Sequence, residues 1–193
     1  PPPPPPPFQA EDGIRDLVLS LVGSEMCIRD RNICEETVFA VTGDTKAPKV
    51  YNILFIDEDN SCQSQIAEAI ARKNFPESGN YSSAGRQPAG ELNPAMVKFL
   101  DSRGTGLSVD ARPSPLDLTP LELSSKHVIV SLQGPAKSYF DQIPFHTTPL
   151  EWDIGPAPES DDEAGIKRLE EIYRDTAMQV RDLMEALRGE GAP

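Results

Sequence analysis

The residues best suited to chemistry lie between positions 57 and 64, where a polar loop follows an apolar run. Ahead of the loop comes the run 53–56, and after it Ile66, Ala67 and Ile70 recur at the spacing of one buried helical face. A strand that leads through a tight loop into a helix offers unpaired N–H groups and a partial positive charge to an anion. The candidate ligand-binding residues are Asp57, Glu58, Asp59, Asn60, Ser61, Cys62, Gln63 and Ser64.

Three carboxylates in this loop argue against an anionic ligand. At the dielectric of a protein surface, each of Asp57, Glu58 and Asp59 would oppose a phosphate dianion by about 1–4 kcal/mol. The helix end would favour the anion by only about 0.3–2 kcal/mol. We therefore predict weak phosphate binding at neutral pH and expect the loop to suit a cation or a basic side chain of a partner. Asp57 and Asp59 are the candidate ligands for Mg²⁺, and no other cofactor is expected.

Strands and helices alternate along the chain on either side of this loop. Such alternation predicts an α/β fold, a three-layer, doubly wound parallel sheet of four strands with right-handed crossovers. The predicted strands cover residues 50–56, 81–84, 127–132 and 147–152, and the predicted helices cover 63–73, 93–104, 136–142 and 161–188, with a further helix beginning at Thr119-Pro120.

The ligand crevice of such a sheet lies beyond the carboxyl ends of its strands. That rule places the loops 57–62, 83–86, 131–135 and 153–158 on one rim. The candidate rim residues are Ser83, Arg86, Arg112, Trp152 and Asp153.

Composition excludes several classes of partner. The net charge of −13 over 193 residues disfavours nucleic acid and anionic membrane surfaces, which need basic patches. Cys27, Cys34 and Cys62 show neither metal-ligand spacing nor a paired framework, so we expect a reducing cytoplasm. No apolar run approaches the length of a bilayer span.

The two ends of the chain are set apart from its centre. Residues 1–31 resemble a translated sequencing-adapter artefact, and the alternative is a disordered stretch or a Pro-rich linker followed by a short amphipathic helix. Residues 32–49 are interpreted as a linker or the remnant of a preceding domain. One domain is predicted over residues 50–188, followed by a tail at 189–193.

Several short motifs in this domain occur in a familiar order. They are Asn60-Ser61-Cys62, Ser64-Gln65, Ala67-Glu68, Ser83-Ala84-Gly85, Asn93-Pro94, Ala111-Arg112, Trp152 and Pro156-Ala157. Together they resemble the superfamily of low-molecular-weight protein tyrosine phosphatases and thioredoxin-coupled arsenate reductases. The resemblance covers about residues 50–187 and implies a sheet with flavodoxin-like strand order.

The catalytic positions implied by that resemblance carry unusual residues. The family loop has the form Cys-x5-Arg-Ser, in which the Cys is a thiolate nucleophile and the Arg grips phosphate oxygens. An Asp before a Pro protonates the leaving oxygen. Here the three positions are Asp57, Gln63 and Gly155. Cys62 matches a second loop cysteine and is expected to be a small buried residue.

These departures lead to two hypotheses. The first is a catalytically inactive phosphatase-like domain that serves as a binding or regulatory module for an unknown protein partner or fused domain. The alternative is residual or altered phosphomonoester hydrolysis, with Asp57 as a carboxylate nucleophile assisted by Mg²⁺. Arsenate reduction is the weaker of the family activities, because the segments that carry its further redox cysteines contain none here.

Overall fold

The computed structural model describes residues 49–108, 110–158 and 160–188. The predictions made for residues 1–31, for most of 32–49 and for the tail 189–193 lie outside these ranges. The elements in chain order are β1 (Tyr51–Asp57), α2 (Gln63–Asn74), β2 (Gly79–Gly85), α3 (Pro94–Ser102), α4 (Pro120–Ser124), β3 (Val128–Ser131), the 3-10 turn η1 (Ala136–Ser138), β4 (Thr148–Glu151) and α5 (Glu163–Arg188).

The four strands form one parallel sheet in the order β2-β1-β3-β4. This arrangement confirms the predicted fold class and the flavodoxin-like order. The apolar run of β1 is buried on both faces, as expected for a central parallel strand. Because all strands point the same way, Asp57 at the end of β1 lies beside Gly85 at the end of β2.

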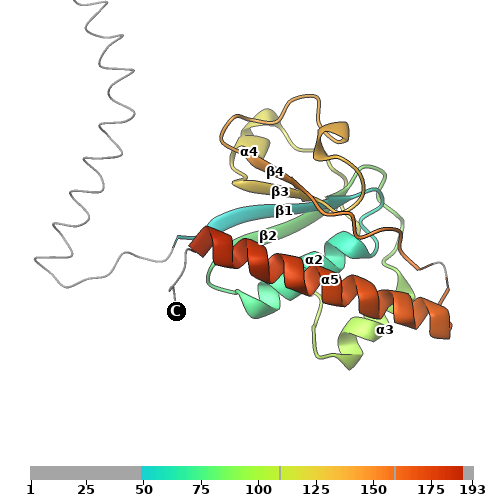
Figure 1. Cartoon of the computed structure of the whole chain (residues 1–193). Helices are drawn as coiled ribbons and strands as arrows, with labels where there is room; N and C mark the ends of the chain where they lie inside the picture. Colours follow the sequence, from blue (N-terminus) through green and yellow to red (C-terminus); the bar gives the residue numbers. More distant parts are fainter. Residues whose placement is uncertain (1–48, 109, 159, 189–193) are drawn as a thin grey trace, which may run out of the picture. The chain divides into compact units, whose positions relative to one another are not determined.

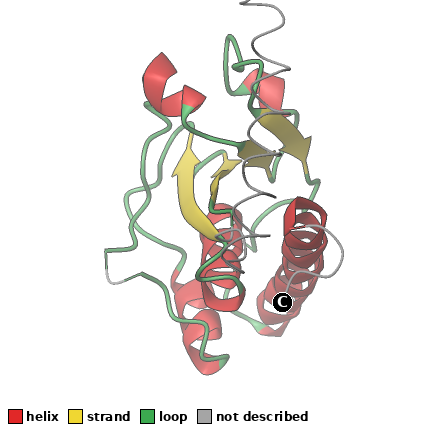
Figure 2. Ribbon diagram, turned by 90° about the vertical axis from the view of Figure 1, so that its left-hand side faces the viewer, coloured by secondary structure: helices red, strands yellow, loops and turns green. Residues whose placement is uncertain are grey.

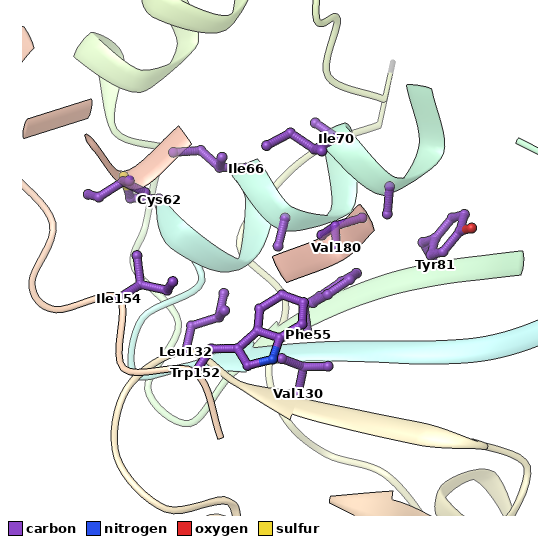
Figure 3. Close-up of a cluster of buried hydrophobic side chains, with 14 of the residues drawn as sticks. Phe55, Cys62, Ile66, Ile70, Tyr81, Val130, Leu132, Trp152, Ile154 and Val180 are labelled. Carbon is purple, nitrogen blue, oxygen red and sulfur yellow. The ribbon is translucent and has the colours of Figure 1, made fainter. Parts of the chain in front are cut away.

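Helices cover both faces of the sheet (Figure 1). On one face α2, α3 and α5 pack together; Figure 2 shows the long α5 beside α2. The main hydrophobic core lies between these helices and the sheet (Figure 3). A smaller cluster on the opposite face joins Leu54, Ile56 and Ile129 of the sheet to Leu123 of α4.

Helix-start signals read from the sequence are confirmed. The Asn93 side chain accepts hydrogen bonds from Ala95 N and Met96 N, with Pro94 at the first helical position. Thr119 forms a capping box with Glu122 at the start of α4. These local bonds set the starts of α3 and α4, the two helices between β2 and β3.

The structure corrects two expectations. The predicted helix over 136–142 is only the turn η1, because Tyr139 turns back to donate to the Gln133 carbonyl. Trp152 is a core residue and not a rim residue: it is buried against Phe55, with ring centroids 6.0 Å apart (Figure 3).

No helix within the described ranges is both long and apolar enough to cross a bilayer.

Candidate functional site

Asp57 lies inside the loop that connects β1 to α2, not on its surface. Its side chain is fully buried. Oδ1 accepts from Asn60 N at 2.7 Å, and Oδ2 accepts from Ser64 N at 2.9 Å. The carboxylate therefore binds main-chain donors of the loop and of the first turn of α2, the kind of donors that a helix end offers to an anion.

Burial raises the pKa of Asp57 to about 6, although hydrogen bonds from Ser64 and Asn60 oppose the rise. Desolvation disfavours the charged form, whereas N–H donors favour it. At neutral pH the group still carries its charge. The loop thus contains its own anion at the position expected for the nucleophile.

Asn60 holds the loop in shape from its centre. Its φ is 52°, a left-handed conformation that Asn tolerates better than most residues. The side chain donates to Ser64 Oγ at 2.7 Å and accepts from Gln65 Nε2 at 3.0 Å and Ser114 N at 2.8 Å. A Cβ on Gly85 would lie 2.7 Å from Asn60 N, so the loop packs directly on the end of β2.

The other two loop carboxylates bind neighbouring residues. Asp59 accepts from Ser61 N at 3.0 Å and from Ser61 Oγ at 2.9 Å. Glu58 lies 3.8 Å from Arg86 Nη1 in an exposed ion pair. Arg86 also stacks over the Tyr139 ring, 4.4 Å from its centroid. The predicted rim residue Arg86 therefore pairs with one of the three loop carboxylates, Glu58.

Gln63 is tied to the loop that carries the expected general acid. Its Nε2 donates to the Gly155 carbonyl at 2.8 Å, and its buried Oε1 has no partner among the described residues. The resemblance implies an Arg at position 63 and an Asp at position 155. The structure brings these two positions together, but the contact is a hydrogen bond from the Gln63 amide to the Gly155 main-chain carbonyl. This contact cannot supply either the positive charge or the proton.

Arg168 of α5 was missed by the sequence reasoning. Its guanidinium donates to the Ile154 carbonyl, and to the Pro156 carbonyl at 3.3 Å. These two bonds hold the 153–158 loop against α5. Gly155 has φ +75°, and a Cβ there would lie 2.6 Å from Arg168 Nη2. An arginine among several on a helix gives no sequence signal for this role.

Cys62 is a fully buried core residue, as expected (Figure 3). Burial raises the pKa of its thiol to about 12, and the carboxylates Asp57 and Asp59 add to the rise. A thiol of this kind is neutral at physiological pH and is a poor nucleophile.

The remaining predicted rim residues are scattered. Ser83 lies within β2, Arg112 is exposed beside a cavity next to that strand, and Asp153 is exposed in the loop after β4. None of them has a described contact with Asp57.

Each oxygen of the predicted Mg²⁺ ligands Asp57 and Asp59 already accepts one hydrogen bond, which takes one of its two lone pairs. Across the part of the chain that the structure describes, no group of three His, Cys, Asp or Glu residues is arranged to hold a metal.

Known proteins are similar to this chain in sequence. The family model for low molecular weight phosphotyrosine protein phosphatase matches residues 52–191. An arsenate reductase of Bacillus licheniformis is 31% identical over 130 residues, which is 67% of this chain and 86% of that protein. An arsenate reductase of Brevibacillus brevis is 31% identical over 58% of this chain and 77% of its own length.

Among solved structures, a low molecular weight protein tyrosine phosphatase from Streptococcus pyogenes superposes with a TM-score of 0.59 at 13% identity. The match covers 72% of this chain and 95% of that one. A thioredoxin-dependent arsenate reductase of Corynebacterium glutamicum gives 0.54 at 24% identity, covering 79% and 68%. These two likenesses concern the fold alone.

Proposed function

This chain belongs to the low molecular weight phosphotyrosine protein phosphatase family, and we propose that it is a catalytically inactive member that serves as a binding module. One observation carries the proposal: the buried Asp57 carboxylate accepts the Asn60 and Ser64 N–H groups. A phosphoryl group would have to compete for these donors against a charge on the same chain. It would also meet the repulsion of that charge.

The chemistry of the loop supports the same conclusion. Asp57 sits where the family places its thiolate, and both of its oxygens are engaged. Gln63 cannot grip phosphate oxygens with charge, and Gly155 has no side chain to donate a proton. The Mg²⁺-assisted alternative requires Asp57 to turn out of its hydrogen bonds and lose its burial before it can attack.

Arsenate reduction is the second activity suggested by the relatives, several of which are arsenate reductases. Its chemistry needs a reactive cysteine. In the ranges that the structure describes, the one cysteine is Cys62, which is buried and protonated. The described part of the chain therefore gives this reaction no reactive cysteine.

The ligand of the module is proposed to be a protein, either a separate partner or a domain fused upstream. The acidic composition favours a basic partner surface over nucleic acid or membrane. The free thiol of Cys62 favours a reducing compartment such as the cytoplasm.

Turnover of p-nitrophenyl phosphate by the full chain, with and without Mg²⁺, tests the proposal. We expect no turnover above the blank in either condition. The double variant Asp57→Cys with Gln63→Arg restores the nucleophile and the clamp and is the positive comparison. Turnover by the natural chain that requires Mg²⁺ and is abolished in Asp57→Ala would overturn the proposal and make Asp57 the nucleophile.

A further inference from the structure

The second face of the sheet is only thinly covered. Helices α2, α3 and α5 lie on the first face, whereas the opposite face has the five-residue α4, the three-residue turn η1 and the loops around them (Figure 1). Parallel sheets normally have both faces buried. At β4 this cover ends: Leu150 packs against the main core, so its neighbour Pro149 faces the other side, where it is exposed.

The loop between η1 and β4 is fixed at both ends and carries an exposed aromatic ring between them. Phe140 packs against the smaller hydrophobic cluster. The Thr147 hydroxyl donates to the Lys126 carbonyl at 2.8 Å. Between these two anchors, the side chain of Phe145 is 106% exposed. The ring is therefore held outward by an anchored loop.

An open groove of about 400 Å³ lies between this loop and β4. Its apolar walls come from Phe140, Ile143, Pro144, Phe145 and Pro149. An aromatic side chain removes about 150–250 Å² from water when it is buried, so an exposed phenylalanine beside an apolar groove favours association. The groove and an aromatic side chain that suits it belong to the same surface.

The charges at this groove are self-complementary. Lys137 and Asp141 both line it, and neither forms an ion pair with a described residue. They are the only charged residues of the stretch 133–150, whose formal charge is therefore zero in a chain of −13. Two copies that meet at this face avoid the repulsion that so acidic a chain exerts elsewhere.

We propose that a second copy of this chain docks at the groove, with Phe145 of each copy in the groove of the other and Lys137 of each copy facing Asp141 of the other. A twofold axis relates the two copies, so that one surface binds the same surface. Contact runs through side chains, because Pro149 has no N–H with which to extend the sheet. The inference concerns a surface outside the loop 57–64 and does not depend on whether that loop is catalytically inactive.

The association is expected to be weak. Specific interfaces bury about 1,200 Å² or more in total, of which the two Phe145 side chains supply about 150–250 Å² each. The other apolar walls of the groove must supply the rest, and association also costs translational and rotational freedom. We therefore expect a dissociation constant between about 1 and 100 µM.

Sedimentation equilibrium of the full chain, at concentrations up to about 1 mM, measures the association. Phe145→Asp places a charge in the groove. Leu121→Asp is the matched control, because Leu121 is 80% exposed and does not line the groove. We expect Phe145→Asp to raise the dissociation constant about tenfold or more, and Leu121→Asp to change it by less than about twofold.

Charge reversal tests the reciprocal pairing. Lys137→Glu alone sets like charges against each other at both ends of the interface, and Asp141→Lys does the same with the opposite sign. Each variant alone should raise the dissociation constant about tenfold or more. An equimolar mixture of the two should associate as tightly as the natural chain, because every pair across the interface then joins opposite charges.

Three outcomes would overturn the proposal. A natural chain that stays monomeric at about 1 mM would do so, and would leave the groove to a partner of another sequence. Association that Phe145→Asp leaves unchanged would place the contact elsewhere on the chain. A mixture of the two charge variants that associates no more tightly than either alone would exclude the reciprocal pairing.

Discussion

At the scale of one residue, Asp57 makes stability depend on pH in the direction opposite to that of an ion-paired carboxylate. Burial raises its pKa from 3.8 to about 6. Because the folded pKa lies above the unfolded one, the native state binds more protons between these values, and the free energy of unfolding rises as the pH falls through this window. The gain is on the order of 3 kcal/mol; it is complete below about pH 4 and is lost as the pH rises from there to about 6. Urea unfolding between pH 4 and pH 8 measures it.

Other carboxylates also titrate in this range, so the quantity of interest is the difference between the natural chain and Asp57→Asn. Asp141→Asn is the matched control, because it removes an exposed carboxylate and leaves Asp57 and its donors in place. Identical pH profiles for the natural chain and Asp57→Asn would show that Asp57 does not bind this proton.

Cys62 should resist modification while the protein is folded. Burial raises the pKa of its thiol from 9.0 to about 12, which lowers the thiolate fraction at pH 8 by roughly a thousandfold. Iodoacetamide labelling followed by peptide mapping distinguishes Cys62 from Cys27 and Cys34. We expect labelling of Cys62 in urea but hardly any in buffer. Rapid labelling in buffer would mean that the core opens around the thiol.

At the scale of elements, α5 completes the main core, and two isoleucines on it can be compared. Ile172 is fully buried and Ile166 is 48% exposed. Ile172→Ala should lower the free energy of unfolding by about 2–5 kcal/mol, because it removes apolar contacts and leaves a cavity. Ile166→Ala should change it by less than about 0.5 kcal/mol. Equal losses in urea unfolding would contradict the packing of α5.

How far the sequence predicts this molecule also depends on the element considered. Periodicity and capping residues were sufficient for the four strands, for their parallel arrangement and for the helix starts at Asn93 and Thr119, because these signals are local. The helix predicted over 136–142 is only a short 3-10 turn, because the Tyr139 hydroxyl turns back and donates to the Gln133 carbonyl.

The site was harder to predict for the same reason. The loop 57–64 could be recognised as the centre of the fold, but the burial of Asp57 could not. Its state depends on bonds that the side chain makes after the loop has closed. The contact from Gln63 to Gly155 joins residues 92 positions apart, and the grip of Arg168 on the same segment joins residues 14 apart. Neither pairing leaves a periodic pattern in the sequence.

At the scale of the whole molecule, the net charge of −13 should weaken the fold through self-repulsion. Salt screens such repulsion, with a Debye length that falls from about 30 Å at 0.01 M to about 10 Å at 0.1 M. We expect the melting temperature to rise when NaCl is added over this range. A gain of roughly 1 kcal/mol corresponds to about 2–4 °C for a chain of this size.

Phosphate at the same ionic strength separates screening from specific binding. A ligand that binds only the native state adds RT ln(1 + [L]/Kd) to its stability. If Asp57 occupies the donors of the loop, phosphate should raise the melting temperature no more than chloride does. Asp57→Ala frees the N–H groups of Asn60 and Ser64 and removes the opposing charge, so phosphate should then stabilise beyond chloride. If phosphate raised the melting temperature of the natural chain more than chloride does, and Asp57→Ala lost this difference, Asp57 would not be the group that occupies the N–H donors of the loop.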